Sequence, residues 1–366
     1  MKFIILLFLL LTHSLSANDG NKEDIKLKKM IGRMLIVGFE DEKIDKKSKI
    51  VKQINEYELG GVILFDRFYS DKTKTKNISS PKQLQELTEK LKSLSAKPLL
   101  ISVDQEGGRV ARLKPAYGFD EIPSALKVSK EGTQHAKQTY AKMAKMLKTN
   151  GINCNFAPIV DLALNPKNSV IVGLERSYGS SHEQVSSYAK ILLDAQKREG
   201  VIGVLKHFPG HGSSLGDSHQ GYVDISDSWS KKELEPYQTL IDSKDVEMIM
   251  TAHVFNSHLD KKYPATLSYK INTKLLREQM NYRGVIVSDD MQMKAISQNY
   301  SVKESVALAI NSGVDMLLFG NQLATQDIDE LVDVILTQVK SGEIPEARIK
   351  ESNKRIEQMF KKSTKE

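Results

Sequence analysis

The sequence predicts an α/β protein built as a single (β/α)8 TIM-type barrel. Eight short apolar runs alternate with segments of helical period along the 366 residues. The runs are continuously apolar, which is typical of strands covered on both faces, as in a parallel sheet. Eight strand–helix units fit the barrel class, which takes about 200 to 400 residues. An open, doubly wound sheet is the alternative, because periodicity does not show closure.

The predicted strands are the apolar runs over residues 34–39, 61–65, 98–104, 152–160, 201–205, 246–254, 284–289 and 313–320. A helix is predicted between the second and third runs, where leucines recur at helical spacing: Leu84, Leu87, Leu91 and Leu94. Five runs follow a glycine that we expect to end the preceding helix in the left-handed conformation, namely Gly60, Gly151, Gly200, Gly284 and Gly313. Residues 345–362 form an amphipathic pattern, and we expect this helix to close the outer ring.

Residues 1–17 have the pattern of a secretory signal peptide. Lys2 precedes an apolar run over residues 3–11 that is too short to span a bilayer, and small or polar residues lead to Ala17. We expect cleavage near Ala17, one mature domain over residues 18–366, and a periplasmic or secreted location. Since no second long apolar segment follows, we expect no stable membrane insertion after the signal is removed.

Charge and cysteine content argue against a nucleic-acid-binding protein and against a fold stabilised by disulfides. The formal net charge is +7, but Lys and Glu are spread along the chain, so we expect a solvated surface and no nucleic-acid partner. The single cysteine, Cys154, lies in an apolar run and forms no internal disulfide; we expect it to be a small buried side chain. We expect the protein to be a monomer.

In a barrel of this class the carboxyl ends of the strands carry the function. Charged residues and histidines gather at those ends: Asp104, Asp161, Lys206, His207, His253 and Asp289. The segment from Lys206 to His219 is a polar loop in which Pro209 and three glycines separate three histidines, a lysine and an aspartate. This set of residues is more typical of a binding or catalytic loop than of an ordinary surface turn. His253 belongs to no motif, so we expect it to be a satisfied structural histidine.

Carboxylates on different strands that face a histidine-rich loop suit glycoside hydrolysis, in which one carboxylate attacks the sugar and a second group protonates the leaving oxygen. A metal site is the alternative, because His207, His211, Asp217 and His219 are all types that bind first-row metals. The spacing is weak evidence for a metal, since the sequence has neither an H-E-x-x-H motif nor a repeated C-x-x-C motif.

The segment KHFPGHGSSLGDSH at residues 206–219 resembles the signature of bacterial β-N-acetylglucosaminidases of glycoside hydrolase family 3. DQEGGRV at residues 104–110 and VSDDM at residues 287–291 resemble further motifs of that family, in the same order. The resemblance covers about residues 30–318. It implies the barrel-only type, with one glycoside hydrolase catalytic domain over residues 18–366.

The resemblance implies roles for the matching residues. Asp289 matches the nucleophile of a retaining mechanism, with a cap on the following helix as its structural alternative. His219 matches the general acid/base and Asp217 its hydrogen-bonded partner, a pairing that orients the ring and favours its charged form. The positions that match those holding the N-acetylglucosamine ring are Asp104, Arg112, Arg176, Lys206 and His207. No cofactor and no metal are implied.

These roles imply a retaining exo-β-N-acetylglucosaminidase that hydrolyses terminal non-reducing N-acetyl-D-glucosamine from peptidoglycan fragments (muropeptides) through a covalent glycosyl-enzyme. Barrel-only relatives in Gram-negative bacteria work in the cytoplasm, whereas this chain has a predicted export signal, so we expect it to meet its substrate outside the inner membrane. The alternatives are a β-N-acetylglucosaminide phosphorylase, because a histidine acid/base does not repel phosphate, a metal-dependent hydrolase, and a non-catalytic sugar-binding barrel.

Overall fold

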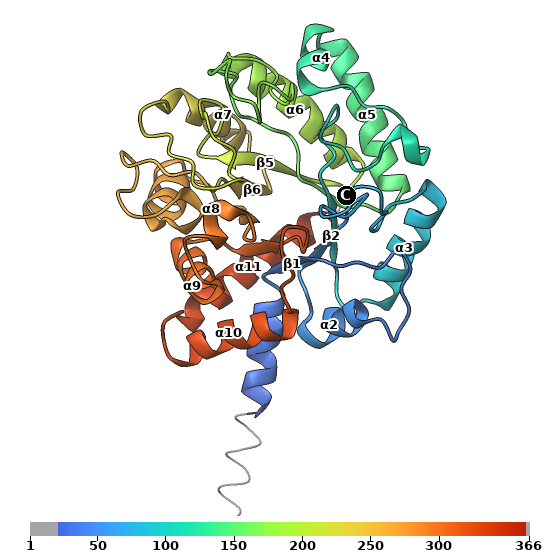
Figure 1. The fold of residues 1–366 in the computed structure, drawn as a ribbon, viewed down its shortest axis with the longest axis vertical. Coiled ribbons are helices and arrows are strands. Elements are labelled where there is room, and N and C mark those ends of the chain that lie inside the picture. The colour runs from blue at the N-terminus through green and yellow to red at the C-terminus, as the bar shows by residue number, and fades with distance from the viewer. Residues whose placement is uncertain (1–20, 364–366) are drawn as a thin grey trace, which may run out of the picture.

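The computed structural model describes residues 21–363 and shows eight parallel strands closed into one barrel (Figure 1). The strands follow one another around the barrel in sequence order, and β8 pairs with β1. Their bounds are β1 (Leu35–Gly38), β2 (Gly61–Ile63), β3 (Leu100–Val103), β4 (Cys154–Asn155), β5 (Ile202–Phe208), β6 (Met248–Thr251), β7 (Val285–Asp290) and β8 (Met316–Phe319). The predicted (β/α)8 fold is therefore confirmed.

Helices surround the strands (Figure 1). They are α2 (Lys49–Tyr57), α3 (Pro81–Leu94), α4 (Ala125–Lys130), α5 (Thr133–Thr149), α6 (His182–Arg198), α7 (Glu235–Asp242), α8 (Lys294–Ser297), α9 (Val302–Ser312), α10 (Ile328–Lys340) and α11 (Glu346–Ser363), and residues 21–32 are also helical. Three short 3-10 helices are η1 (Pro115–Tyr117), η2 (Lys231–Leu234) and η3 (Ala265–Leu267), and η4 (Lys270–Gln279) is a π-helix. No helix within residues 21–363 has the length and apolar character needed to cross a bilayer. The predicted signal peptide, residues 1–17, lies outside the described residues.

Every strand differs from its predicted bounds at one end or at both, and the differences at β5 and β4 bear on the site. The predicted fifth strand ends at Leu205, whereas β5 continues to Phe208, which pairs with Thr251 of β6. Lys206 and His207 therefore project from a strand and not from a loop. The predicted fourth strand spans residues 152–160, but β4 is only Cys154–Asn155. Pro158 lies within the lost part, and proline has no N–H to donate to a strand ladder.

The predicted left-handed glycines are partly confirmed. Positive φ angles occur at Gly151, Gly200 and Gly313. Gly60 does not have a positive φ; the left-handed residue after α2 is Glu58. A Cβ at Gly60 would lie 2.2 Å from the carbonyl oxygen of Arg33, so close backbone packing is what requires a glycine there. Gly284 also has no positive φ.

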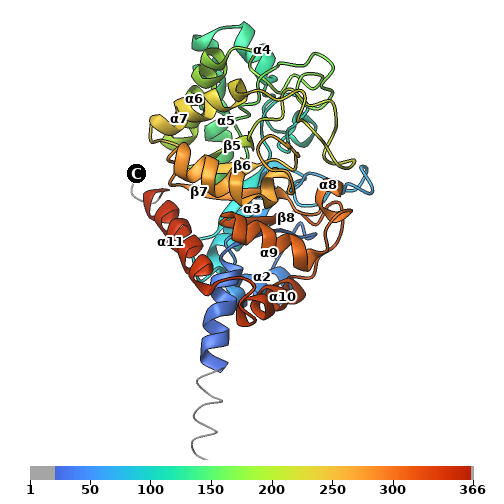
Figure 2. The same ribbon diagram turned by 90° about the vertical axis from the view of Figure 1, so that its left-hand side faces the viewer.

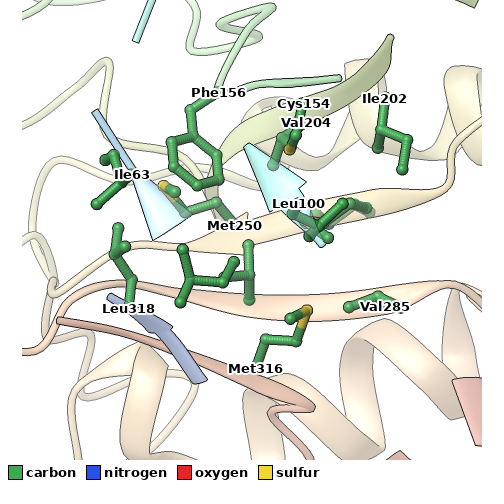
Figure 3. Packing of buried hydrophobic residues seen from close by; sticks show 14 of the residues in the cluster. Ile63, Leu100, Cys154, Phe156, Ile202, Val204, Met250, Val285, Met316 and Leu318 are labelled. Atoms are coloured by element: carbon green, nitrogen blue, oxygen red, sulfur yellow. The ribbon is translucent and has the colours of Figure 1, made fainter. Parts of the chain in front are cut away.

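Apolar side chains from the strands fill the barrel (Figure 3). Cys154 is fully buried among them, as predicted. Three of these apolar side chains, Ile63, Met250 and Leu318, lie near the carboxyl ends of their strands and also line the cavity described below. The barrel is thus a packed core whose last layer is the bottom of a cavity.

The amino end of the barrel is closed around one buried carboxylate. Asp315, directly before β8, is fully buried, and its oxygens accept from Arg277 of η4 and from Arg348 and Arg355 of α11. These bonds hold α11 against the amino ends of the strands. Figure 2 shows α11 on the side away from the long loops that follow the strands. The expectation that this helix closes the outer ring is therefore wrong.

We predict that Asp315→Ala lowers the free energy of unfolding by about 3–5 kcal/mol, because it leaves the guanidinium groups of Arg277, Arg348 and Arg355 without their buried counter-charge. Glu278→Ala is the control, since it breaks an exposed pair with Lys274 whose contribution is at most about 0.5 kcal/mol. Denaturant unfolding of both variants measures the difference. Equal midpoints for the two variants would contradict the role of Asp315.

Candidate active site

A cavity of about 550 Å³ opens at the carboxyl ends of the strands. This volume lies within the ~300–1,000 Å³ typical of ligand pockets. All eight residues that the sequence predicts for the site line it: Asp104, Arg112, Arg176, Lys206, His207, Asp217, His219 and Asp289. The fold therefore brings together residues from β5 and β7 and from the segments that follow β3, β4 and β5.

Five charged side chains form an ionic network on the wall of this cavity. Lys206 Nζ lies 2.9 Å from Asp104 Oδ1 and 2.8 Å from Glu106 Oε1. Arg176 binds both oxygens of Glu106 at 2.8 Å. Arg112 Nη2 lies 3.1 Å from Asp104 Oδ2. Because buried charges are stable only when they are paired, each member of the network holds the others in place.

The ionic network keeps its members charged. Burial acts to raise the pKa of Asp104, but the charges of Lys206 and Arg112 hold that pKa well below its usual range. Burial acts to lower the pKa of Lys206, but Asp104 and Glu106 raise it. Lys206 is almost fully buried, whereas the side chains of Asp104 and Arg112 are 17% and 24% exposed. The exposed parts can therefore offer fixed donors and acceptors to the hydroxyls of a sugar.

His207 is oriented by a buried carboxylate. Its Nδ1 lies 2.7 Å from Asp161 Oδ2, and Asp161 Oδ1 also accepts the backbone N–H of His211 at 2.8 Å. Burial opposes ionisation of Asp161, but the charge of His207 and its hydrogen bond lower the pKa of this carboxyl. An ionised Asp161 makes Nδ1 the donor and leaves the other ring nitrogen of His207 for a ligand.

Asp289, near the end of β7, is an ionised carboxylate in the cavity. Its Oδ1 accepts the backbone N–H of Asp290 at 2.8 Å. Burial acts to raise the pKa of Asp289, but the nearby imidazoles, first His253 and then His207, lower it. The N-cap of α8 is Met293, so Asp289 does not cap the helix that follows β7. Its carboxylate is free for chemistry.

Asp217 and His219 form a hydrogen-bonded pair in the loop after β5. His219 Nδ1 lies 2.8 Å from Asp217 Oδ1, and the backbone N–H of His219 donates to the same oxygen at 2.9 Å. Burial acts to lower the pKa of His219, but the bond to Asp217 and the charge of Asp289 raise it. The hydrogen bond with His219 lowers the pKa of Asp217 to about 2. The free nitrogen of such an imidazole can give and take a proton.

Two other histidines have internal partners. His253 Nδ1 lies 2.8 Å from Thr266 Oγ1 and its Nε2 lies 2.9 Å from the carbonyl oxygen of Asp290, which confirms the expectation of a structural histidine. His211 Nδ1 lies 2.7 Å from Ser214 Oγ. In the part of the chain that the structure describes, no three His, Cys, Asp or Glu side chains are grouped so that they could hold a metal ion.

The sequence did not assign a site role to Glu106 or Asp161. Both are acidic residues just beyond a predicted strand or at the end of one, which was the signal available for them. Their partners, Arg176 and His207, lie 70 and 46 residues further along the chain. Spacing along the sequence does not reveal such pairs.

Comparisons with known proteins agree with this geometry. The chain is 34% identical over 287 residues to beta-hexosaminidase A of Pseudoalteromonas piscicida, covering 72% of this chain and 46% of that protein. It is 36% identical over 272 residues to a beta-hexosaminidase of Tolumonas auensis, covering 73% of this chain and 77% of that protein. The chain thus spans about half the length of the first relative.

A similar solved structure is that of a glycoside hydrolase family 3 β-N-acetylglucosaminidase from a Paenibacillus species. Its TM-score is 0.82 at 32% identity, over 92% of this chain and 62% of that one. The family described as the N-terminal domain of glycosyl hydrolase family 3 matches residues 26–359. Since this match takes in most of the sequence and nearly all of the barrel, the chain belongs to glycosyl hydrolase family 3.

Proposed function

We propose that the protein is a retaining exo-β-N-acetylglucosaminidase that releases terminal non-reducing N-acetyl-D-glucosamine. The observation that carries this proposal is that an ionised Asp289 and the Asp217–His219 pair line one cavity beside the ionic network. The names of the relatives, beta-hexosaminidase and β-N-acetylglucosaminidase, support the same activity.

In the first step, a carboxylate oxygen of Asp289 bonds to C1 of the sugar as the bond from C1 to the leaving oxygen breaks. Protonated His219 gives its Nε2 proton to that oxygen, so the aglycone departs as an alcohol and a glycosyl-enzyme remains. Asp217 accepts from Nδ1 and stabilises the charged ring before the transfer.

In the second step, neutral His219 takes a proton from water through Nε2, and the water oxygen bonds to C1. Asp289 leaves as a carboxylate, and the imidazole is protonated again. The two displacements at C1 each invert its configuration, so the released sugar keeps the β configuration. The mechanism needs a carboxylate that is ionised in the free enzyme and a second group that can both give and accept a proton. The lowered pKa of Asp289 suits the first role, and the raised pKa of His219 suits the second.

We propose that Asp104, Arg112, Arg176, Lys206 and His207 hold the hydroxyl and acetamido groups of the sugar. Glu106 holds Arg176 and Lys206, and Asp161 holds His207. This supports the role, because donors fixed before binding lose little freedom when the sugar arrives. All the proposed residues line a cavity of a single chain, which supports action as a monomer. The predicted export signal supports a periplasmic or secreted enzyme that acts on peptidoglycan fragments.

We predict that Asp289→Ala lowers hydrolysis of p-nitrophenyl β-N-acetylglucosaminide by roughly 10³-fold or more, because the carboxylate that bonds to C1 is lost. Release of p-nitrophenol, with the β-glucoside as a second substrate, measures this. Glu278→Ala, on an exposed helix surface, is the control and keeps full activity.

The same assay, run with phosphate or EDTA present and absent, tests the alternatives. Activity that requires phosphate would indicate a phosphorylase, and loss to EDTA would indicate a metal enzyme. Binding of the sugar by folded wild-type protein without turnover would overturn the proposal in favour of a sugar-binding barrel.

We predict that Asp217→Asn moves the alkaline limb of the pH profile of kcat/KM to lower pH. The first step needs ionised Asp289 and protonated His219, so activity is lost as the pH rises through the pKa of His219. Asp217 raises that pKa, and removing its charge lets the proton leave at lower pH. The variant should therefore lose more activity at pH 8 than at pH 6. An equal loss at every pH would show that Asp217 does not set this pKa.

A further inference from the structure

We propose that Glu233 of η2 is a positioning residue for proton transfer, a role that rests on the function proposed above. Its side chain is 1% exposed, and it is not among the residues that line the cavity. It acts by holding the loop after β5, which carries the Asp217–His219 pair. We call residues 210–214 the loop base and residues 215–220 the loop tip.

Both carboxylate oxygens of Glu233 bind the loop base. Oε2 accepts the backbone N–H of Gly212 at 2.9 Å, and Oε1 accepts the hydroxyl of Ser213 at 2.5 Å. A Cβ at Gly210 would lie 2.5 Å from the Cβ of Glu233, so the backbone of the loop base packs directly against this side chain. Burial raises the pKa of Glu233 to about 7 against the opposing bond from Ser213. The carboxyl is thus buried at a cost, and its polar contacts are with the loop base.

Side chains from the segment after β4 hold the opposite side of the loop base. Asp161 accepts the N–H of His211 at 2.8 Å. Asn168 donates to the carbonyl oxygens of His211 and Gly212 at 2.8 and 3.2 Å, and Asn165 donates to those of Ser213 and Ser214 at 3.1 and 3.2 Å. The loop base is therefore clamped between two parts of the chain, one before it and one after it.

The loop tip is held less firmly. Leu215 is 68% exposed and the side chain of His219 is 48% exposed. Beyond bonds within the loop, the backbone N–H of Ala295 donates to the carbonyl oxygen of Ser218 at 3.2 Å. The position of His219 thus depends on the loop base. Removing Glu233 would leave buried donors of Gly212 and Ser213 without acceptors, and the base would shift to recover partners.

The test compares two substrates in Glu233→Ala and Glu233→Gln. The first is 2,4-dinitrophenyl β-N-acetylglucosaminide, whose leaving group departs without a proton, and the second is a β-1,4-linked N-acetylglucosamine disaccharide, whose leaving group needs one. In the Ala variant we expect kcat/KM for the disaccharide to fall about 10²-fold, as for a catalytic group displaced by about 1 Å. For the dinitrophenyl substrate it should fall less than about threefold, because acid catalysis is not needed. The Gln variant keeps one acceptor, so its kcat/KM for the disaccharide should lie between the values of the Ala variant and the wild type.

Asp260→Asn is the matched control. Asp260 is a buried carboxylate in the segment after β6 that accepts from Ser268 at 2.6 Å. Asp260→Asn should change kcat/KM for the two substrates by the same factor. The melting temperatures of all variants report any loss of stability. If the Ala variant does not fold, the Gln variant alone gives the ratio between the two substrates.

An equal loss on both substrates in the Glu233 variants would show a structural role alone and overturn the inference. If the wild type hydrolyses both substrates and the Glu233 variants have the same kcat/KM values as the wild type, the inference is also overturned, while the proposed function stands. A folded wild type that hydrolyses neither substrate would instead overturn the proposed function.

Discussion

The pairing of buried charges is the constraint on which the active end of this barrel depends. Lys206 is 3% exposed and lies between Asp104 and Glu106, so none of the three could be buried without the others. Since these residues come from β5 and from the segment after β3, and Arg176 comes from the loop after β4, the ionic network also fixes how these segments sit. Its three cations pair with Asp104 and Glu106, whereas Asp289 accepts the backbone N–H of Asp290 and lines the same cavity.

The same physical device has a different result at the other end of the barrel. Asp315 is also a buried carboxylate held by guanidinium groups, but it lies at the amino ends of the strands, and two of its partners come from α11. Among the described residues, none of those in this cluster lines the cavity at the carboxyl ends of the strands. One ionic cluster therefore anchors a helix, whereas the other forms the wall of the cavity that we propose binds the sugar, in keeping with the division of barrels into a stabilising end and a functional end.

Firm and loosely held parts are combined within the functional end. Side chains from distant segments hold both Arg176 of the ionic network and the backbone of the loop base. The Asp217–His219 pair sits on a loop tip that is more exposed. A group that must deliver a proton to a departing aglycone and then take one from water has to be reachable from solvent, so this exposure suits an acid/base pair. Because the loop base beside the pair is firmly held, the exposed pair can still keep the position that proton transfer requires.

The eight strand–helix units and eight of the residues that line the cavity could be predicted from the sequence, because apolar runs, helical period and motifs are local patterns. Closure of the sheet into a barrel was favoured by the number of units but is shown only by the pairing of β8 with β1. Local patterns did not fix the strand ends: β4 stops before Pro158, and β5 extends to Phe208, which pairs with Thr251 of β6. Only the tertiary structure showed that Glu106 binds Arg176, that Asp161 orients His207, and that α11 closes the amino end. The partners in these bonds lie tens of residues apart, and closure of the barrel is what decides which of them meet.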